Sequence, residues 1–315
     1  MIPVERATGP DVERSIRLEV PLDLRRTLGI HRRGRADPAL RFEPSGAAWR
    51  ATRTPDGPAT LLVDIHAGAV RGRAWGPGAR WVADRMADLV GLDDRPEALV
   101  PMHPAVAAAS KRLRGMRLGR TSAVLESLVP AILEQKVTGD EARHAYRRLM
   151  WTYGEPAPGP PGLRLPPAAQ TLAALPYHAF HPLGVERRRA DLIRAIAREA
   201  PRLERLALDA GGPDGNPSHA YAVLQAFPGI GPWTAAEVGI RAFGDPDAVS
   251  VGDYHLPSMV TWALAGERRG TDERMLELLE VYRGQRGRVL RLLELAGAGA
   301  PRRGPRMATR RIARI

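Results

Sequence analysis

Leu224-Gln-Ala-Phe-Pro-Gly-Ile-Gly-Pro-Trp-Thr-Ala235 is the stretch of this 315-residue chain that decides its fold. A helix is expected to end at Phe227, because the residue before a proline disfavours the α conformation. Gly229 and Gly231 allow positive φ angles and a tight hairpin, and Pro232 suits the first position of a second helix. The backbone N–H groups at the start of that helix suit a phosphate oxygen. The stretch therefore predicts two short helices and a hairpin that binds the backbone of DNA.

One acidic residue stands at a fixed separation from the hairpin. Asp253, in the segment Val251-Gly-Asp-Tyr254, follows Gly231 by 22 positions. A DNA anchor with a carboxylate at fixed reach indicates chemistry on DNA. Asp253 also suits the N-cap of a helix expected from Tyr254 onward, because aspartate is a favoured cap. The two interpretations are compatible, since a capped carboxylate is immobile and stays ionised.

These motifs resemble the helix-hairpin-helix (HhH-GPD) base-excision DNA glycosylase superfamily, and within it the bacterial 3-methyladenine DNA glycosylase II type. The residues that carry the resemblance are Phe227-Pro-Gly-Ile-Gly231, Trp233-Thr-Ala235 and Asp253-Tyr254. Upstream, Val129-Pro-Ala-Ile-Leu-Glu-Gln-Lys-Val-Thr-Gly139 contains a similar Ile-Leu-x-Gln segment. A weaker match is Leu183-Gly-Val-Glu-Arg-Arg-Arg-Ala190.

The resemblance implies a reaction and a role for each matching residue. An enzyme acting on the glycosidic bond must rotate the nucleotide out of the duplex. Asp253 would stabilise the positive charge that develops on the sugar. Trp233 would offer a π face to an electron-poor base, and Tyr254 would line the same cleft.

The same resemblance implies a DNA-binding surface. Two of its residues, Gln135 and Lys136, lie at the family's wedge, which fills the gap left by the extruded base. The others belong to the hairpin and the start of the second helix: Pro228, Gly229, Ile230, Gly231 and Thr234. At the position of Lys136, the well-known bacterial alkylation glycosylase has an apolar residue, so this chain differs from the family there. Which of Gln135 and Lys136 fills the gap therefore stays open, and an exposed helix end is the simpler interpretation of both.

The reaction expected is base release without strand cleavage. Superfamily members that also cut the strand use a lysine at the position of Trp233 to form a Schiff base with the sugar. The two lysines of this chain, Lys111 and Lys136, lie outside that segment. Two alternatives stay open: an enzyme of the same fold acting on oxidised or deaminated bases, and a non-catalytic protein that binds damaged DNA.

Composition limits the choice of partner and cofactor. The net charge of +12 and the pI near 11 favour a polyanion such as double-stranded DNA. No apolar run reaches the roughly 20 residues that a membrane span needs, and the N-terminus lacks the apolar core of a signal peptide, so we expect a cytoplasmic monomer. The absence of cysteine excludes disulfides and cysteine-ligated iron–sulfur clusters. No metal or organic cofactor is expected, although the family would allow a monovalent cation at the hairpin.

The chain is expected to be an α+β protein in three parts. Residues 1–100 form a β-rich domain, an antiparallel sheet with helices over one face. Strands are expected over 15–20, 47–54, 60–66 and 69–75, and helices over 21–33 and 80–89. Residues 101–298 form the helical glycosylase domain. Residues 299–315, with six arginines and no acidic residue, form a basic tail expected to be mobile.

Ten helices are expected in the helical domain, and Pro130 is expected to start a new helix or kink the second one. Their expected ranges are 104–116, 121–137, 140–153, 170–175, 185–200, 217–226, 232–243, 254–265, 272–282 and 286–295. The proline-rich segment that begins at Glu155 is expected to be a loop.

Overall fold

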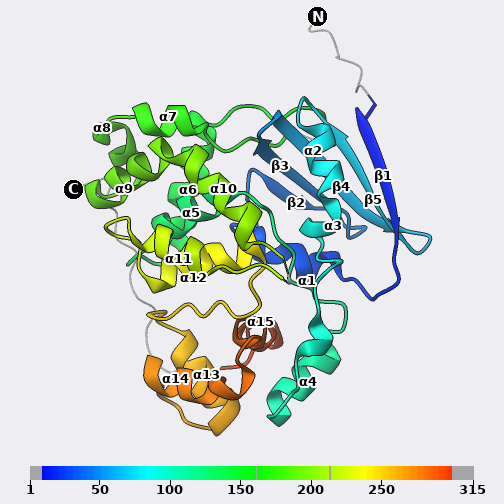
Figure 1. Cartoon of the computed structure of the whole chain (residues 1–315). Coiled ribbons are helices and arrows are strands. Elements are labelled where there is room, and N and C mark those ends of the chain that lie inside the picture. Colours follow the sequence, from blue (N-terminus) through cyan, green and yellow to red (C-terminus); the bar gives the residue numbers. More distant parts are fainter. Residues whose placement is uncertain (1–8, 161, 213, 300–315) are drawn as a thin grey trace, which may run out of the picture.

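A computed structural model of the chain describes residues 9–160, 162–212 and 214–299. An antiparallel sheet is followed by a large helical region, as the α+β prediction required (Figure 1). Nearly all of the predicted basic tail, residues 300–315, lies outside the described residues. Within the described ranges, none of the helices combines the length and apolar character needed to cross a bilayer.

In the described residues the sheet has five strands in the order β1-β5-β4-β3-β2, and every neighbouring pair is antiparallel. The strands are β1 (Val12–Arg17), β2 (Leu40–Phe42), β3 (Ala48–Thr54), β4 (Gly57–His66) and β5 (Ala69–Trp75). Three expectations were inaccurate: the first strand lies three residues earlier than predicted, β4 begins three residues earlier than predicted, and the three-residue β2 was not predicted. β2 is too short to show an alternating pattern, and its pairing with β3 creates it.

Three short helices complete the first hydrophobic core. They are α1 (Leu24–Leu28), α2 (Ala79–Asp84) and α3 (Met86–Leu89). Their buried side chains share one cluster with Leu61 and Val63 of β4. Figure 1 shows α2 and α3 lying over the sheet. The expected helix over 21–33 is therefore much shorter, and a 3₁₀ turn, Gly29–His31, follows it.

Twelve helices follow α3 in the described part of the chain, and all ten helices predicted for the helical domain are among them. Their bounds are α4 (Pro104–Arg112), α5 (Val124–Glu134), α6 (Gly139–Tyr153), α7 (Ala169–Ala174), α8 (Tyr177–Phe180), α9 (Arg187–Arg198), α10 (Ala200–Ala210), α11 (Ser218–Gln225), α12 (Pro232–Val238), α13 (Leu256–Ala265), α14 (Asp272–Leu279) and α15 (Arg286–Ala296). The sequence did not predict α8 and α10. A π-helical turn, Gly239–Phe243, extends α12.

The helical region has two main hydrophobic cores. The larger cluster joins side chains from α5, α6, α7, α9, α10, α11 and α12. A separate cluster joins α4 with α13, α14 and α15. Figure 1 shows this second group of helices below the first. The loop between α12 and α13 connects the two groups, and this loop contains Asp253.

Helix α5 is continuous through Pro130, which does not begin a new helix. Seven neighbouring positions of α5 are buried along with Pro130, so tertiary packing compensates for the missing backbone hydrogen bond. The start of α5 is capped from a distant helix: the Glu204 carboxylate accepts the N–H groups of Val124 and Leu125 at 2.8 and 2.9 Å. Burial raises the pKa of Glu204 to about 7, against the lowering effect of these two bonds.

An ion pair joins the end of the N-terminal region to α15. Arg288 is 1% exposed, and its Nη1 donates to Asp94 Oδ2 at 3.0 Å. Asp94 Oδ2 also accepts the N–H of Leu118 at 2.9 Å. A buried charge is tolerated only when it is paired and hydrogen-bonded. The pair therefore fastens α15 to the connection between the sheet and the helices.

Replacing Arg288 with alanine should destabilise the fold strongly, because it leaves the Asp94 carboxylate buried without its partner. We expect a loss of about 3–5 kcal/mol in the free energy of unfolding, measured by urea denaturation. Arg283→Ala is the matched control, since its pair with Glu280 is mostly exposed and should contribute about 1 kcal/mol or less. Equal losses in the two variants would contradict this role of Arg288.

Candidate active site

The hairpin between α11 and α12 has the expected tight turn. Gly229 adopts a φ of +106°, and the N–H of Ile230 closes the turn on the carbonyl of Phe227 at 2.9 Å. The expectation of positive φ holds for Gly229 only, because Gly231 is extended with φ −100° and ψ −177°. A Cβ at Gly231 would meet nothing within 4 Å. The contribution of Gly231 is therefore an open surface at the hairpin rather than an unusual backbone conformation.

The start of α12 offers hydrogen-bond donors next to this open surface. The N–H of Ala235 bonds the carbonyl of Gly231 at 3.0 Å and begins the helix. Among the described residues, the N–H groups of Gly231, Trp233 and Thr234 have no backbone acceptor. Such groups at a helix N-terminus favour an anion. Pro228 is exposed at the tip of the hairpin, whereas the side chain of Ile230 is buried and anchors it.

Gln135 supports the hairpin from the end of α5. Its Nε2 donates to the carbonyl of Gly229 and to Thr234 Oγ1, both at 2.9 Å. Both amide hydrogens are therefore engaged within the protein, and the side chain faces the hairpin rather than solvent. Lys136, the next residue, is exposed and adopts a positive φ of 55°. This conformation is costly for a residue other than glycine and directs the chain away from α5.

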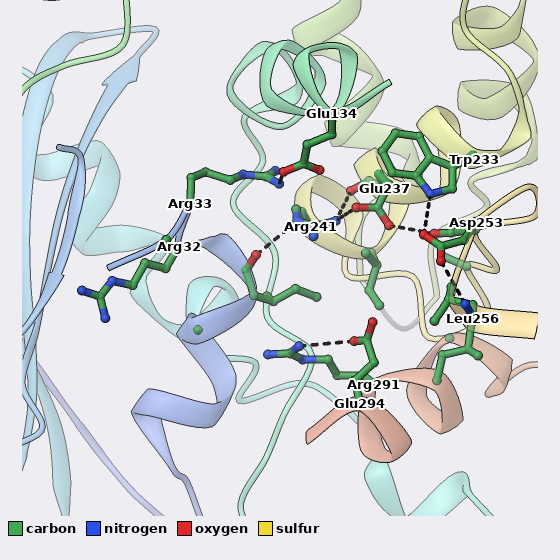
Figure 2. A pocket seen from close by; sticks show the side chains of 18 of the residues that line it. Arg32, Arg33, Glu134, Trp233, Glu237, Arg241, Asp253, Leu256, Arg291 and Glu294 are labelled. Atoms are coloured by element: carbon green, nitrogen blue, oxygen red, sulfur yellow. Dashed lines mark hydrogen bonds and ion pairs between the residues drawn. The ribbon is translucent and has the colours of Figure 1, made fainter. Parts of the chain in front are cut away.

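The carboxylate of Asp253 is held by three hydrogen bonds. Oδ2 accepts the indole N–H of Trp233 at 3.1 Å. Oδ1 accepts the backbone N–H groups of His255 and Leu256 at 2.6 and 2.9 Å. Asp253 therefore binds the first N–H of α13, but the N-cap position is His255 and not Asp253 as expected, because the helix begins at Leu256 rather than at Tyr254. Figure 2 shows this carboxylate and the Trp233 ring side by side in the wall of a cavity. The structure thus brings Asp253 and Trp233 together, one from each side of the junction between the two helical groups.

The expectation that Tyr254 lines the same cleft is corrected by the structure. Its side chain is 86% exposed, and its ring lies edge-on to that of His255 with centroids 4.9 Å apart. The Asp253 side chain turns inward to cap α13, and the neighbouring Tyr254 projects to the outside. Tyr254 is not among the residues that line the cavity.

The cavity next to Asp253 has a volume of about 330 Å³, within the range of small-molecule sites. Trp233 and Asp253 form one wall. The N-terminal region contributes Gly29–Gly34 except His31, and α15 contributes Arg291 and Glu294. The sequence did not reveal these last two contributions. In sequence, Arg291 and Glu294 are ordinary charged residues three positions apart on a helix, and only the packing of α15 directs them into the cavity.

Ion pairs surround the cavity, which is more highly charged than the sequence indicated. Glu237 pairs with Arg241 at 2.6 Å, and Arg33 from the N-terminal region pairs with Glu134 at 3.1 Å. Burial opposes ionisation of Glu237, but Arg241 beside it and the hydroxyl of Ser250, which donates to it at 2.8 Å, hold the pKa of Glu237 below its usual value. Arg241 also donates to the carbonyl of Ile30 at 3.1 Å, which fastens the N-terminal region to α12.

Glu294 differs from these paired groups. It lines the cavity, its contact with Arg291 is longer, at 3.4 Å, and 44% of its side chain is accessible. Partial burial raises the pKa of Glu294 above its usual value, an effect that Arg291 opposes and Glu237 reinforces.

Comparison with known proteins shows which family the hairpin and the Asp253 segment resemble. The family described as "HhH-GPD superfamily base excision DNA repair protein" matches residues 129–283, which include the C-terminal half of α5, the hairpin and Asp253. Residues 129–283 thus match the HhH-GPD superfamily. The predicted resemblance is thereby confirmed.

Three known proteins illustrate the similarity. The chain is 33% identical over 174 residues to a probable bifunctional transcriptional activator/DNA repair enzyme AlkA of Mycobacterium tuberculosis. The aligned region covers 53% of this chain and 34% of that protein. It is 29% identical over 198 residues to DNA-3-methyladenine glycosylase 2 of Escherichia coli, covering 62% of this chain and 64% of that protein. The chain thus spans about a third of the length of the first relative and just under two thirds of the length of the second.

A solved structure resembles the whole fold, sheet included. The 3-methyladenine DNA glycosylase from Archaeoglobus fulgidus superimposes with a TM-score of 0.72 at 21% identity, over 90% of this chain and 97% of that one. The sheet and both helical groups therefore belong to one architecture that a solved protein shares.

Replacing Gln135 with alanine should loosen the hairpin, because the carbonyl of Gly229 and the hydroxyl of Thr234 lose a shared donor. We expect a loss of about 1–3 kcal/mol in the free energy of unfolding. Amide hydrogen exchange of residues 229–234 should accelerate. Gln225→Ala is the matched control, because Gln225 is exposed on α11 and bonds only the carbonyl of Tyr221. Unchanged amide exchange at the hairpin in the Gln135 variant would contradict the role of Gln135 in holding the hairpin.

Proposed function

We propose that this protein is a monofunctional DNA glycosylase that extrudes alkylated purines of the 3-methyladenine type from double-stranded DNA and hydrolyses their glycosidic bonds in base-excision repair. The observation that carries this proposal is the hydrogen bond between Trp233 and Asp253 in the wall of a base-sized cavity, directly after the hairpin. The names of the relatives support it. Without base release, the same surface would serve a non-catalytic protein that binds damaged DNA.

DNA would bind along the hairpin. The open surface at Gly231 and the N–H groups that begin α12 would contact a phosphate, which sets the register without reading sequence. The net charge of +12 would strengthen attraction to the duplex. Gln135 is engaged with the hairpin, so Lys136, exposed at the end of α5, is better placed to enter the gap left by the base. Its apolar stem would fill space and its ammonium would contact a phosphate.

Asp253 would act on the sugar of the extruded nucleotide. Breaking the glycosidic bond develops positive charge at the anomeric carbon, and a fixed carboxylate stabilises it without reorganising. The bonds from Trp233, His255 and Leu256 hold Asp253 in place. Water would attack the anomeric carbon, and the Trp233 ring would pack against the departing base. A cationic alkylated purine leaves readily and needs no further catalyst.

Asp253→Asn tests the assignment of the carboxylate. Asparagine keeps an oxygen that can cap α13 but removes the negative charge, so release of 7-methylguanine from a methylated duplex should fall by at least about 100-fold. Binding to the same duplex should stay within a few-fold of the wild-type value. Single-turnover release and fluorescence anisotropy measure the two quantities. Wild-type turnover by the variant would remove Asp253 from the mechanism.

We also propose that the protein does not cleave the DNA strand, because no lysine stands where a Schiff base with the sugar would form. Neither Lys111 nor Lys136 lies on α12, where Trp233 stands. Borohydride should therefore trap no covalent complex with DNA containing an abasic site, which denaturing electrophoresis would show. A trapped complex that disappears in Lys136→Met would show that Lys136 forms an imine and would overturn this proposal.

A monovalent cation at the hairpin fits the available carbonyl groups. The carbonyl of Phe227 accepts one hydrogen bond, from Ile230, and keeps a second lone pair. A bound cation would supply positive charge for a phosphate at the hairpin. Cytoplasmic location and a monomeric state remain predictions from the sequence.

A further inference from the structure

Arg143 of α6 lines the same cavity, and its side chain is held in place by two glycines. A Cβ at Gly34 would lie 2.6 Å from Arg143 Cδ, and a Cβ at Gly139 would lie 2.9 Å from Arg143 Nη1. A side chain at either position would therefore displace the arginine. Arg143 is nevertheless exposed, with 47% of its side chain accessible. Fixing a long exposed side chain costs conformational entropy, so its fixed position suits a preformed binding site.

The segment of the N-terminal region that carries Gly34 is rigid. Gly34 has a φ of +87°, a conformation that favours glycine. The preceding residue, Arg33, forms a partly buried ion pair with Glu134 at 3.1 Å. After the glycine, the buried carboxylate of Asp37 accepts the N–H groups of Arg33 and Ala39 at 2.6 and 2.9 Å. The N-terminal region therefore presents Gly34 to Arg143 at a defined position.

Arg143 and the hairpin lie on different sides of the end of α5. Glu134, the last residue of α5, pairs with Arg33, whereas the next residue, Gln135, bonds the hairpin. Figure 2 shows Arg33 and Glu134 meeting at one side of the cavity, with Trp233 at the other. A DNA strand that crosses the cavity from the hairpin would therefore meet Arg143.

The surroundings of Arg143 are positively charged. The segment Arg32–Ala36 contains three arginines and no acidic residue. Arg35 in this segment is exposed, and among the described residues it has no ion-pair partner. Arg143 itself donates to Asp140 at 2.6 Å, and 77% of the Asp140 side chain is accessible. Exposed ion pairs of this kind contribute little stability, so an anion can replace Asp140 at small cost.

We propose that Arg143 binds a phosphate of the lesion strand, on the opposite side of the extruded nucleotide from the phosphate at the hairpin. The inference rests on the proposed glycosylase function. An extruded nucleotide keeps its two flanking phosphates, and its sugar must reach Asp253 in the cavity wall. The strand therefore crosses the entrance of the cavity, with the hairpin at one end of the crossing and Arg143 at the other.

Two fixed phosphate contacts define the position of the nucleotide between them. Contacts of this kind set the register of the protein on DNA without reading sequence. The planar guanidinium of arginine can bind a phosphate through two parallel hydrogen bonds, which also sets the orientation of the phosphate. The N-terminal region takes part in DNA binding through Gly34, because this residue determines where the Arg143 side chain lies.

Arg143→Gln tests the contact by removing the charge. The ligand is a duplex that contains a tetrahydrofuran abasic site, and fluorescence anisotropy measures the dissociation constant at several salt concentrations. We expect the dissociation constant to rise about 10-fold, and the slope of its logarithm against the logarithm of salt concentration to fall by roughly one unit. Arg80→Gln is the matched control and should change neither quantity, because Arg80 is exposed on α2, which lies over the sheet.

Neutral phosphates identify the group that Arg143 contacts. A single methylphosphonate replaces, in turn, each phosphate close to the abasic site on both strands of the duplex. In the wild-type protein, we expect a methylphosphonate next to the abasic site on the lesion strand to weaken binding, and Arg143→Gln should be insensitive to the same replacement. The phosphate at the hairpin should remain sensitive in both proteins, because Arg143 does not contact it.

Gly34→Ala tests the part played by the N-terminal region without changing any charge. The added methyl group displaces Arg143, so binding should weaken about 3- to 10-fold, and adding Gly34→Ala to Arg143→Gln should cause no further loss. Gly46→Ala is the matched control, because Gly46 has a similar φ of +93° but a Cβ there would meet nothing within 4 Å. Both alanines strain the backbone, but Gly46→Ala should keep the wild-type affinity for the duplex.

Several results would overturn the proposal. One is an unchanged affinity and salt slope in Arg143→Gln, and another is equal affinity of the Gly34→Ala and Gly46→Ala variants. A methylphosphonate effect that is found only on the complementary strand, or that Arg143→Gln retains in full, would have the same consequence. These measurements use a duplex from which no base is released. Failure of the wild-type protein to release any base from methylated DNA would instead show that the proposed glycosylase function is wrong, so the two failures are distinguishable.

Discussion

The site depends on the set of hydrogen bonds that ends at the Asp253 carboxylate. One oxygen binds the indole of Trp233, at the start of the helix after the hairpin, and the other binds two N–H groups at the start of α13. These elements belong to different hydrophobic groups of the helical region. A single carboxylate therefore links the DNA-facing hairpin to the second helical group and is itself immobilised by that link.

The cavity exists because three parts of the molecule meet at this link. The segment after α1 comes from the N-terminal region, α12 follows the hairpin, and α15 belongs to the second helical group. Ion pairs line the cavity at this junction, beside an apolar cluster that joins α12 to α15. Arg241 pairs with Glu237 and also donates to the carbonyl of Ile30. Buried pairs of this kind contribute little net stability when compared with apolar packing. Their effect here is to present fixed donors and acceptors around the space that a base would enter.

Particular elements show how far sequence reasoning reached. Helices with clear apolar periodicity were predicted to within a few residues, and the antiparallel sheet followed from alternation in β3, β4 and β5. Helix α10 was missed because it begins directly after α9, with Pro201 in its first turn. The positive φ expected at Gly231 was incorrect, because local sequence shows that glycine permits such an angle but does not require it. The family resemblance placed Tyr254 in the pocket, but the turn before α13 directs its side chain outward.

The sequence by itself determined the parts of the site that are close together in the chain: the hairpin, the helix it starts, and a carboxylate 22 residues later. Their spacing and the rules of glycine, proline and capping are local, so they can be read without coordinates. Tertiary structure alone decided which distant side chains join them. Gln135 became a clamp on the hairpin, and Arg33, Arg291 and Glu294 became cavity walls. The reason is physical: long charged side chains on helix surfaces look alike in sequence, and packing between elements determines which of them face an enclosed space.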